Sequence, residues 1–143
     1  MGSVLGKVVL AAALLCAAPG ALAQTPGPQA TATDLKTETG VIEGATYRID
    51  MPAKWNGGLV VMNHGYSPEP RIPAAGPASA RIRVFTDRGF AVAQSSYSKG
   101  GWAIEQAMTD NARLIKHFAS RNKKPSPVIA TGGAMGASVT TAS

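Results

Sequence analysis

Residues 128–138, "VIATGGAMGAS", decide the fold class of this 143-residue chain. Their apolar, β-branched start predicts a strand, and the glycines that follow predict a sharp turn. The next residues, "ASVTTAS", predict the start of a helix. A strand, a glycine-rich turn and a helix in this order are typical of a parallel sheet with crossover connections. Such a turn presents either a nucleophile or backbone N–H groups that bind a phosphate.

Two upstream segments are predicted to be buried strands. Residues 59–63, "LVVMN", and 90–96, "FAVAQSS", are apolar runs typical of strands covered on both faces of a parallel sheet. Between them, "ASARIRVFTDRG" predicts a short helix, with Pro77 in its first turn and Gly89 at its C-terminal stop.

A longer amphipathic helix is predicted between Ala103 and Ser120. Its expected buried stripe consists of Ile104, Met108, Ala112, Ile115 and Ala119, flanked by Ala107 and Phe118. Its expected polar face consists of Glu105, Gln106, Asp110, Arg113 and Lys116. Near the start of the chain, two alternating runs around Glu43-Gly44 predict an antiparallel hairpin whose second arm covers residues 45–50. The sequence therefore predicts an α/β fold, with an N-terminal hairpin followed by parallel strands and crossover helices.

The N-terminus has the form of a secretory signal. A lysine at Lys7, an apolar run and the ending "ALA" before Gln24 predict cleavage after Ala23. The apolar run is too short for a stable membrane anchor, so we expect a secreted or periplasmic protein. Residues 1–23 are then the signal, 24–37 a flexible lead-in and 38–143 the N-terminal portion of one domain.

Composition excludes several function classes. The formal net charge is +6, but the basic residues are scattered and not interleaved with aromatic residues, so no nucleic-acid partner is expected. The only cysteine, Cys16, lies inside the predicted signal, so disulfide and thiol chemistry are not expected in the mature chain.

The glycine-rich turn fits two patterns. Read from Gly132 to Gly136 it is G-x-A-x-G, which differs from the G-x-S-x-G nucleophile elbow by one serine-to-alanine change at Ala134. Read from Thr131 to Ser138 it resembles the T-G-x-x-x-G-x-G turn of short-chain dehydrogenases, in which glycines approach a cofactor pyrophosphate, although the last glycine is missing.

The position of the turn favours the elbow. In the dehydrogenase pattern the turn follows the first strand, whereas here two buried strands precede it. One of them ends in "VVMNHGY", with His64-Gly65 directly after the apolar run. The segments "YRIDMPAKWNGGLVVMNHGY", "GFAVAQSSYSKGGWAIEQAMTDN" and "VIATGGAMGAS" together resemble the N-terminal half of a secreted bacterial α/β-hydrolase, in the esterase, lipase and prolyl-oligopeptidase-like branch.

This resemblance implies hydrolysis of a small-molecule ester, or less readily an amide or peptide-like bond, through an acyl-enzyme. It implies neither a metal nor a cofactor. It implies the following roles: Ala134 at the nucleophile position, Gly132 and Gly136 as elbow glycines, Tyr66 and Met135 as the oxyanion-hole N–H donors, and His64 and Gly65 in the oxyanion loop. Tyr97 and Trp102 follow the end of a strand, where α/β sheets bind ligands, and are candidates for lining the pocket.

Two departures from the family pattern predict an inactive chain. Alanine cannot attack a carbonyl, and the family places its acid and histidine after the nucleophile, where few residues remain here. His64 is expected to hold a loop, His117 to be solvated, Asp110 and Arg113 to form a surface pair, and Ser138 to be an ordinary helix residue. A non-catalytic secreted binding protein of the same fold therefore remains an alternative.

Overall fold

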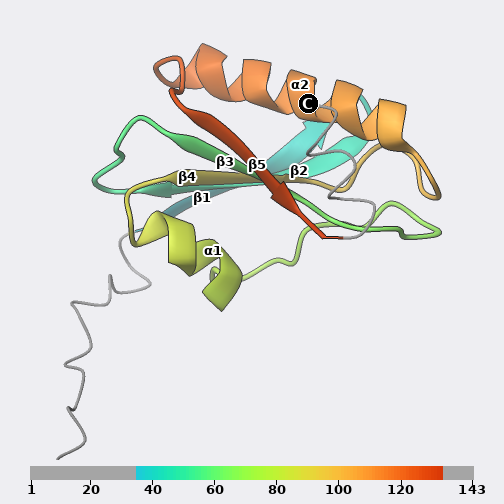
Figure 1. The fold of residues 1–143 in the computed structure, drawn as a ribbon, viewed down its shortest axis with the longest axis horizontal. Coiled ribbons are helices and arrows are strands. Elements are labelled where there is room, and N and C mark those ends of the chain that lie inside the picture. Colours follow the sequence, from blue (N-terminus) through green and yellow to red (C-terminus); the bar gives the residue numbers. More distant parts are fainter. Residues whose placement is uncertain (1–34, 134–143) are drawn as a thin grey trace, which may run out of the picture.

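The structure is a computed structural model that describes residues 35–133. Its five strands form one mixed sheet in the order β1-β2-β4-β3-β5. Two helices, α1 and α2, cover opposite faces of this sheet (Figure 1). The elements are β1 (Leu35–Ile42), β2 (Ala45–Pro52), β3 (Leu59–Asn63), α1 (Ala80–Thr86), β4 (Ala91–Ser95), α2 (Ile104–Arg121) and β5 (Val128–Gly132). The predicted α/β fold class is confirmed.

The N-terminal hairpin forms around the predicted turn. Ile42 pairs with Ala45, so Glu43 and Gly44 make a two-residue loop. Both have positive φ, 48° and 84°, which matches the twist of antiparallel strands. The strands are longer than predicted, because β1 begins at Leu35, inside the expected lead-in, and β2 continues to Pro52. The predicted signal, residues 1–23, lies outside the described residues.

The buried centre of the sheet is β3, which pairs in parallel with β4 on one side and β5 on the other. Its side chains alternate between the two faces, as the pleat of a strand requires. Leu59 and Val61 join Leu114 and Phe118 of α2 in one core cluster. Val60 instead packs with Ile82 of α1 and with Val92 on the other face. The parallel strands predicted from the apolar runs are thus confirmed.

Helix α1 begins later than predicted. It starts at Ala80, with Ser79 as its N-cap, so Pro77 lies in the preceding loop and not in the first helical turn. The helix is positioned by Ile82, which is 5% exposed and packs against the sheet. The helix ends at Thr86, and the predicted stop residue, Gly89, closes the turn that follows it. Gly89 has a φ of 87°, and its N–H donates to the Thr86 carbonyl.

The buried face of α2 is displaced from the predicted stripe toward its two flanking residues, Ala107 and Phe118. Four members of the stripe are half-buried: Ile104, Met108, Ile115 and Ala119. The buried residues are Ala107, Asp110, Asn111, Leu114 and Phe118, whereas Ala112 is exposed. Hydropathy places Asp110 and Asn111 outside, but both find polar partners under the helix. The Asn111 amide donates to Asn63 Oδ1 at 2.7 Å, at the end of β3.

Asp110 is not the surface residue that the sequence predicts. Its carboxylate is buried and accepts hydrogen bonds from the N–H of Ser98, at 2.7 Å, and from the Ser98 hydroxyl, at 2.9 Å. Gln106 donates to the other carboxylate oxygen at 3.1 Å, and the expected contact from Arg113 is present at 3.3 Å. Asp110 therefore ties the loop after β4 to α2.

His117 is not solvated as the sequence predicts. Its Nε2 lies 3.1 Å from Glu38 Oε1 and 3.1 Å from the Tyr47 hydroxyl, which itself donates to Glu38 at 2.7 Å. The hydrogen bond with His117 is the main cause that lowers the pKa of Glu38, while burial and the bond to Glu38 raise the pKa of Tyr47. This polar cluster fastens α2 to β1 and β2.

A buried ion pair lies in β2. Arg48 and Asp50 are 2% and 0% exposed, and the guanidinium donates to both carboxylate oxygens at 2.8 Å. Thr37 of β1 also donates to Asp50 at 2.8 Å. The remaining arm of the guanidinium donates to the Ala74 carbonyl at 2.7 Å, so this pair connects the sheet to the loop between β3 and α1.

Removal of the Asp50 carboxylate should destabilise the fold strongly. In Asp50→Ala the Arg48 charge stays buried without its partner, and we expect a loss of about 3 to 5 kcal/mol in the free energy of unfolding, measured by urea denaturation. The double variant R48M/D50L removes both charges and should recover most of this loss. Equal stability of Asp50→Ala and the native chain would contradict the role of the pair.

Candidate active site

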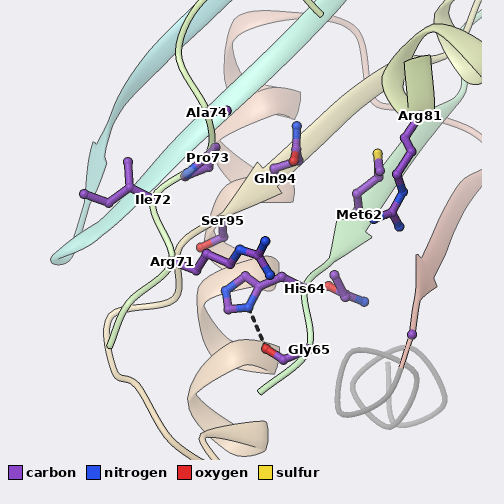
Figure 2. A pocket seen from close by; sticks show the side chains of 12 residues that line it. Met62, His64, Gly65, Arg71, Ile72, Pro73, Ala74, Arg81, Gln94 and Ser95 are labelled. Carbon is purple, nitrogen blue, oxygen red and sulfur yellow. Dashed lines mark hydrogen bonds between the residues drawn. The ribbon is translucent and has the colours of Figure 1, made fainter. Parts of the chain in front are cut away.

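A cavity of about 350 Å³ opens where β3, β4 and β5 end. Parallel strands bring their carboxyl ends to one edge of a sheet, which is where α/β folds bind ligands. The lining residues are shown in Figure 2 and come from strand ends, from the loop after β3 and from α1: Met62, Asn63, His64, Gly65, Arg71, Ile72, Pro73, Ala74, Arg81, Gln94, Ser95 and Gly133. Residues 64–65 and 133, far apart in the sequence, thus meet in one cavity.

His64 lines this cavity, and its side chain is fixed by contacts with two loops. Its Nδ1 lies 2.8 Å from the Gly65 carbonyl, and its Nε2 lies 3.1 Å from the Ser96 carbonyl. Its ring stacks on Tyr97, with centroids 4.1 Å apart. Carbonyl oxygens only accept hydrogen bonds, so both ring nitrogens face groups that favour donation. This geometry suits a residue that joins two loops better than it suits a general base.

Tyr97 lies behind His64 and does not line the cavity. It is 1% exposed, has a φ of 55°, and donates from its hydroxyl to the His64 carbonyl at 3.3 Å. Burial raises the pKa of this phenol to about 12, so it stays protonated at neutral pH. A left-handed backbone at a buried tyrosine is unusual and is held here by the surrounding contacts.

Tyr66 and Trp102 lie together outside the cavity lining. They are 53% and 73% exposed, and their rings are tilted with centroids 5.8 Å apart. Trp102 lines a second, more open hollow at the start of α2. Of the two pocket residues that the sequence proposes, neither Tyr97 nor Trp102 contacts the space at the strand ends.

The loops that carry these residues are fastened to each other. Ser67 and Gly101 form an isolated bridge, in which the Gly101 N–H donates to the Ser67 carbonyl at 2.7 Å. At Gly100 the two loops approach so closely that an added Cβ would lie 2.1 Å from the Pro68 carbonyl oxygen. Glycine is required there because no side chain fits against the neighbouring backbone.

Gly100→Ala should therefore displace the loop after β3. We expect a loss of stability larger than in Gly101→Ala, where a Cβ meets nothing within 4 Å and only the φ of 78° is unfavourable. That backbone cost is about 1 to 2 kcal/mol. Thermal unfolding of the two variants side by side is the measurement, and a smaller loss for Gly100→Ala would contradict the close approach.

The elbow is only partly within the described residues. Gly132 ends β5 in register with Asn63, and Gly133 reaches the cavity. The nucleophile position Ala134, together with Met135, Gly136 and Ser138, lies outside the described residues.

Sequence reasoning missed most of the cavity lining. Arg71 and Arg81 come from a long loop and from the surface of a short helix, and neither belongs to a motif. Gln94 and Ser95 end β4. The strand-end argument was applied to the aromatic residues of the loop that follows, Tyr97 and Trp102, and not to these last two residues of the strand.

The described part of the chain contains neither a metal-ligand cluster nor a membrane-spanning helix. Between residues 35 and 133 no group of three or more His, Cys, Asp or Glu side chains is placed to hold a metal ion. Over the same range, no helix is long and apolar enough to cross a membrane.

No protein-family model matches the chain, and no curated protein matches its sequence. Solved structures do match. Acylaminoacyl peptidase from Pyrococcus horikoshii has a TM-score of 0.56 at 13% identity, over 75% of this chain and 20% of its own. Brefeldin A esterase, a bacterial homologue of human hormone sensitive lipase, has a TM-score of 0.54 at 20% identity. The match covers 85% of this chain and 37% of the esterase. These neighbours are α/β-hydrolases.

The chain has a partial α/β-hydrolase fold. A third neighbour agrees: a serine-to-alanine mutant of puromycin hydrolase in complex with PGG matches with a TM-score of 0.54 at 22% identity, over 74% of this chain and 19% of its own. The chain thus spans between about a fifth and two fifths of the length of these three α/β-hydrolases. At these identities the likeness establishes the fold.

Proposed function

We propose that this chain is the N-terminal part of an exported serine-type hydrolase that cleaves esters, or less readily amides and peptide bonds, through an acyl-enzyme. The observation that carries the proposal is the meeting of residues 64–65 and Gly133 in one cavity at the ends of parallel strands. These are the two turns that the resemblance assigns to the oxyanion loop and the elbow. Esterases and peptidases among the structural neighbours support the same reaction class.

The proposed chemistry follows from this placement. A nucleophile directly after Gly133 would attack a carbonyl at the mouth of the cavity. The N–H groups of Tyr66 and Met135 would stabilise the negative charge on the carbonyl oxygen in the transition state. His64, held by two carbonyls and by Tyr97, would keep the oxyanion loop in place. Because the methyl side chain of Ala134 has no nucleophilic oxygen, the chain as written is proposed to be inactive.

A non-catalytic binding protein is the second candidate. Ala134 favours it, because an alanine at the nucleophile position cannot form an acyl-enzyme. Such a protein would keep the cavity and bind a small molecule without cleaving it. Tight binding of a dinucleotide would instead favour the dehydrogenase-like interpretation of the turn.

Restoration of the serine separates these candidates. Ala134→Ser, made in the longest natural reading frame that contains this chain, should react with a fluorophosphonate probe and hydrolyse p-nitrophenyl acyl esters. We expect a gain of about 10³-fold or more over Ala134, since a triad nucleophile contributes at least that much. Ala130→Ser, which adds a hydroxyl within β5, is the matched control. A restored serine that neither labels nor turns over would refute the elbow assignment.

The proposed signal peptide can be tested separately. If residues 1–23 are a cleaved signal, the protein isolated from a cell that exports it should begin at Gln24, and N-terminal sequencing measures this directly. A mature chain that still begins at Met1 would contradict the proposal of a secreted or periplasmic location.

A further inference from the structure

The cavity at the strand ends carries two guanidinium groups and, among its lining residues, no carboxylate. Arg71 lies in the loop after β3, and Arg81 lies in α1. Figure 2 shows them on two sides of the cavity, Arg71 beside His64 and Arg81 next to Met62. Positive side chains that converge from separate segments on one hollow create a local field that attracts anions.

Neither guanidinium is neutralised within residues 35–133. The acidic side chains that make ion pairs there are engaged elsewhere: Asp50 pairs with Arg48, Asp110 with Arg113, and Glu38 with His117 and Arg121. Both cavity arginines are exposed to solvent. They are therefore available to a ligand that enters the cavity.

The backbone that presents these arginines is anchored. The N–H of Arg71 donates to the Ser96 carbonyl at 3.2 Å, the same carbonyl that lies against His64. A few residues later, Arg48 holds the carbonyl of Ala74 at 2.7 Å. Ile82, next to Arg81, is buried against the sheet. A ligand would thus meet cations whose backbone is already ordered, which reduces the entropy lost on binding.

We propose that this cavity binds a small ligand that carries an oxyanion, a carboxylate or a phosphate, between Arg71 and Arg81. The planar guanidinium forms paired hydrogen bonds to such groups. Neutral polar side chains of Gln94 and Ser95 complete the lining, and a volume of about 350 Å³ suits a small metabolite. If the chain is also part of a hydrolase, its substrate would be an ester that carries an acidic group. This last step alone rests on the proposed function.

Binding can be measured without turnover. The intact protein is titrated by calorimetry with glutarate, with inorganic phosphate and with the neutral analogue glutaramide at low ionic strength. We expect the oxyanions to bind and glutaramide not to bind. Arg71→Gln and Arg81→Gln should each weaken binding roughly tenfold, as expected for one charge-assisted contact. Added salt should weaken binding further.

Arg88→Gln is the matched control, because Arg88 is exposed but does not line the cavity. It should bind the oxyanions as the native protein does. Preference for glutarate over phosphate identifies a carboxylate ligand, and the reverse identifies a phosphate. Equal binding of glutarate and glutaramide, or unchanged affinity in both cavity variants, overturns the inference.

A turnover measurement separates this inference from the proposed function. In the Ala134→Ser protein, the p-nitrophenyl monoester of glutaric acid is compared with p-nitrophenyl butyrate. Faster hydrolysis of the acidic ester supports both the oxyanion site and the hydrolase function, provided that Arg71→Gln and Arg81→Gln abolish the preference. Hydrolysis without this preference, together with no oxyanion binding, overturns the inference alone. Oxyanion binding without fluorophosphonate labelling overturns the proposed hydrolase function and leaves the binding site standing.

Discussion

The parallel pairing of β3 with a strand on each side is the constraint on which the rest of the structure depends. Each residue of this five-residue strand has a partner on β5, and the residues from Leu59 to Met62 also pair with β4. Parallel register makes the strands end together, so the turns after them emerge at one edge. The cavity lies at that edge, and His64 and Gly133 both line it because the strands before them are paired and end side by side.

Buried polar groups hold the loops around that edge. Arg48 secures the loop before α1, and Asp110 secures the loop after β4. Burial of each charge costs desolvation free energy. The hydrogen bonds to the charged group offset this cost only when they are well formed. Such groups accept few alternative loop positions, which suits a site whose function depends on where backbone N–H groups point. The stacked rings of His64 and Tyr97 join the two loops to each other.

The candidate site could be predicted in part from the sequence. The residues that belong to local motifs, His64-Gly65 and the glycines of the turn, were found because strand and turn patterns are local in the chain. Arg71 and Arg81 could not be found, since nothing in the sequence brings a long loop and a short helix to the same cavity. Tyr97 and Trp102 were placed by proximity to a strand end, but backbone direction decides on which side of a loop a ring lies.

By itself, the sequence determined the element types and their order: the hairpin at Glu43-Gly44, the apolar parallel strands and the stop at Gly89 after α1. These features depend on periodicity and on the φ angles that glycine permits, which are properties of short segments. Only the tertiary structure decided which face of α2 is buried. Asp110 and Asn111 point inward because partners from β3 and from the loop after β4 satisfy them there, and a hydropathy pattern carries no information about such distant partners.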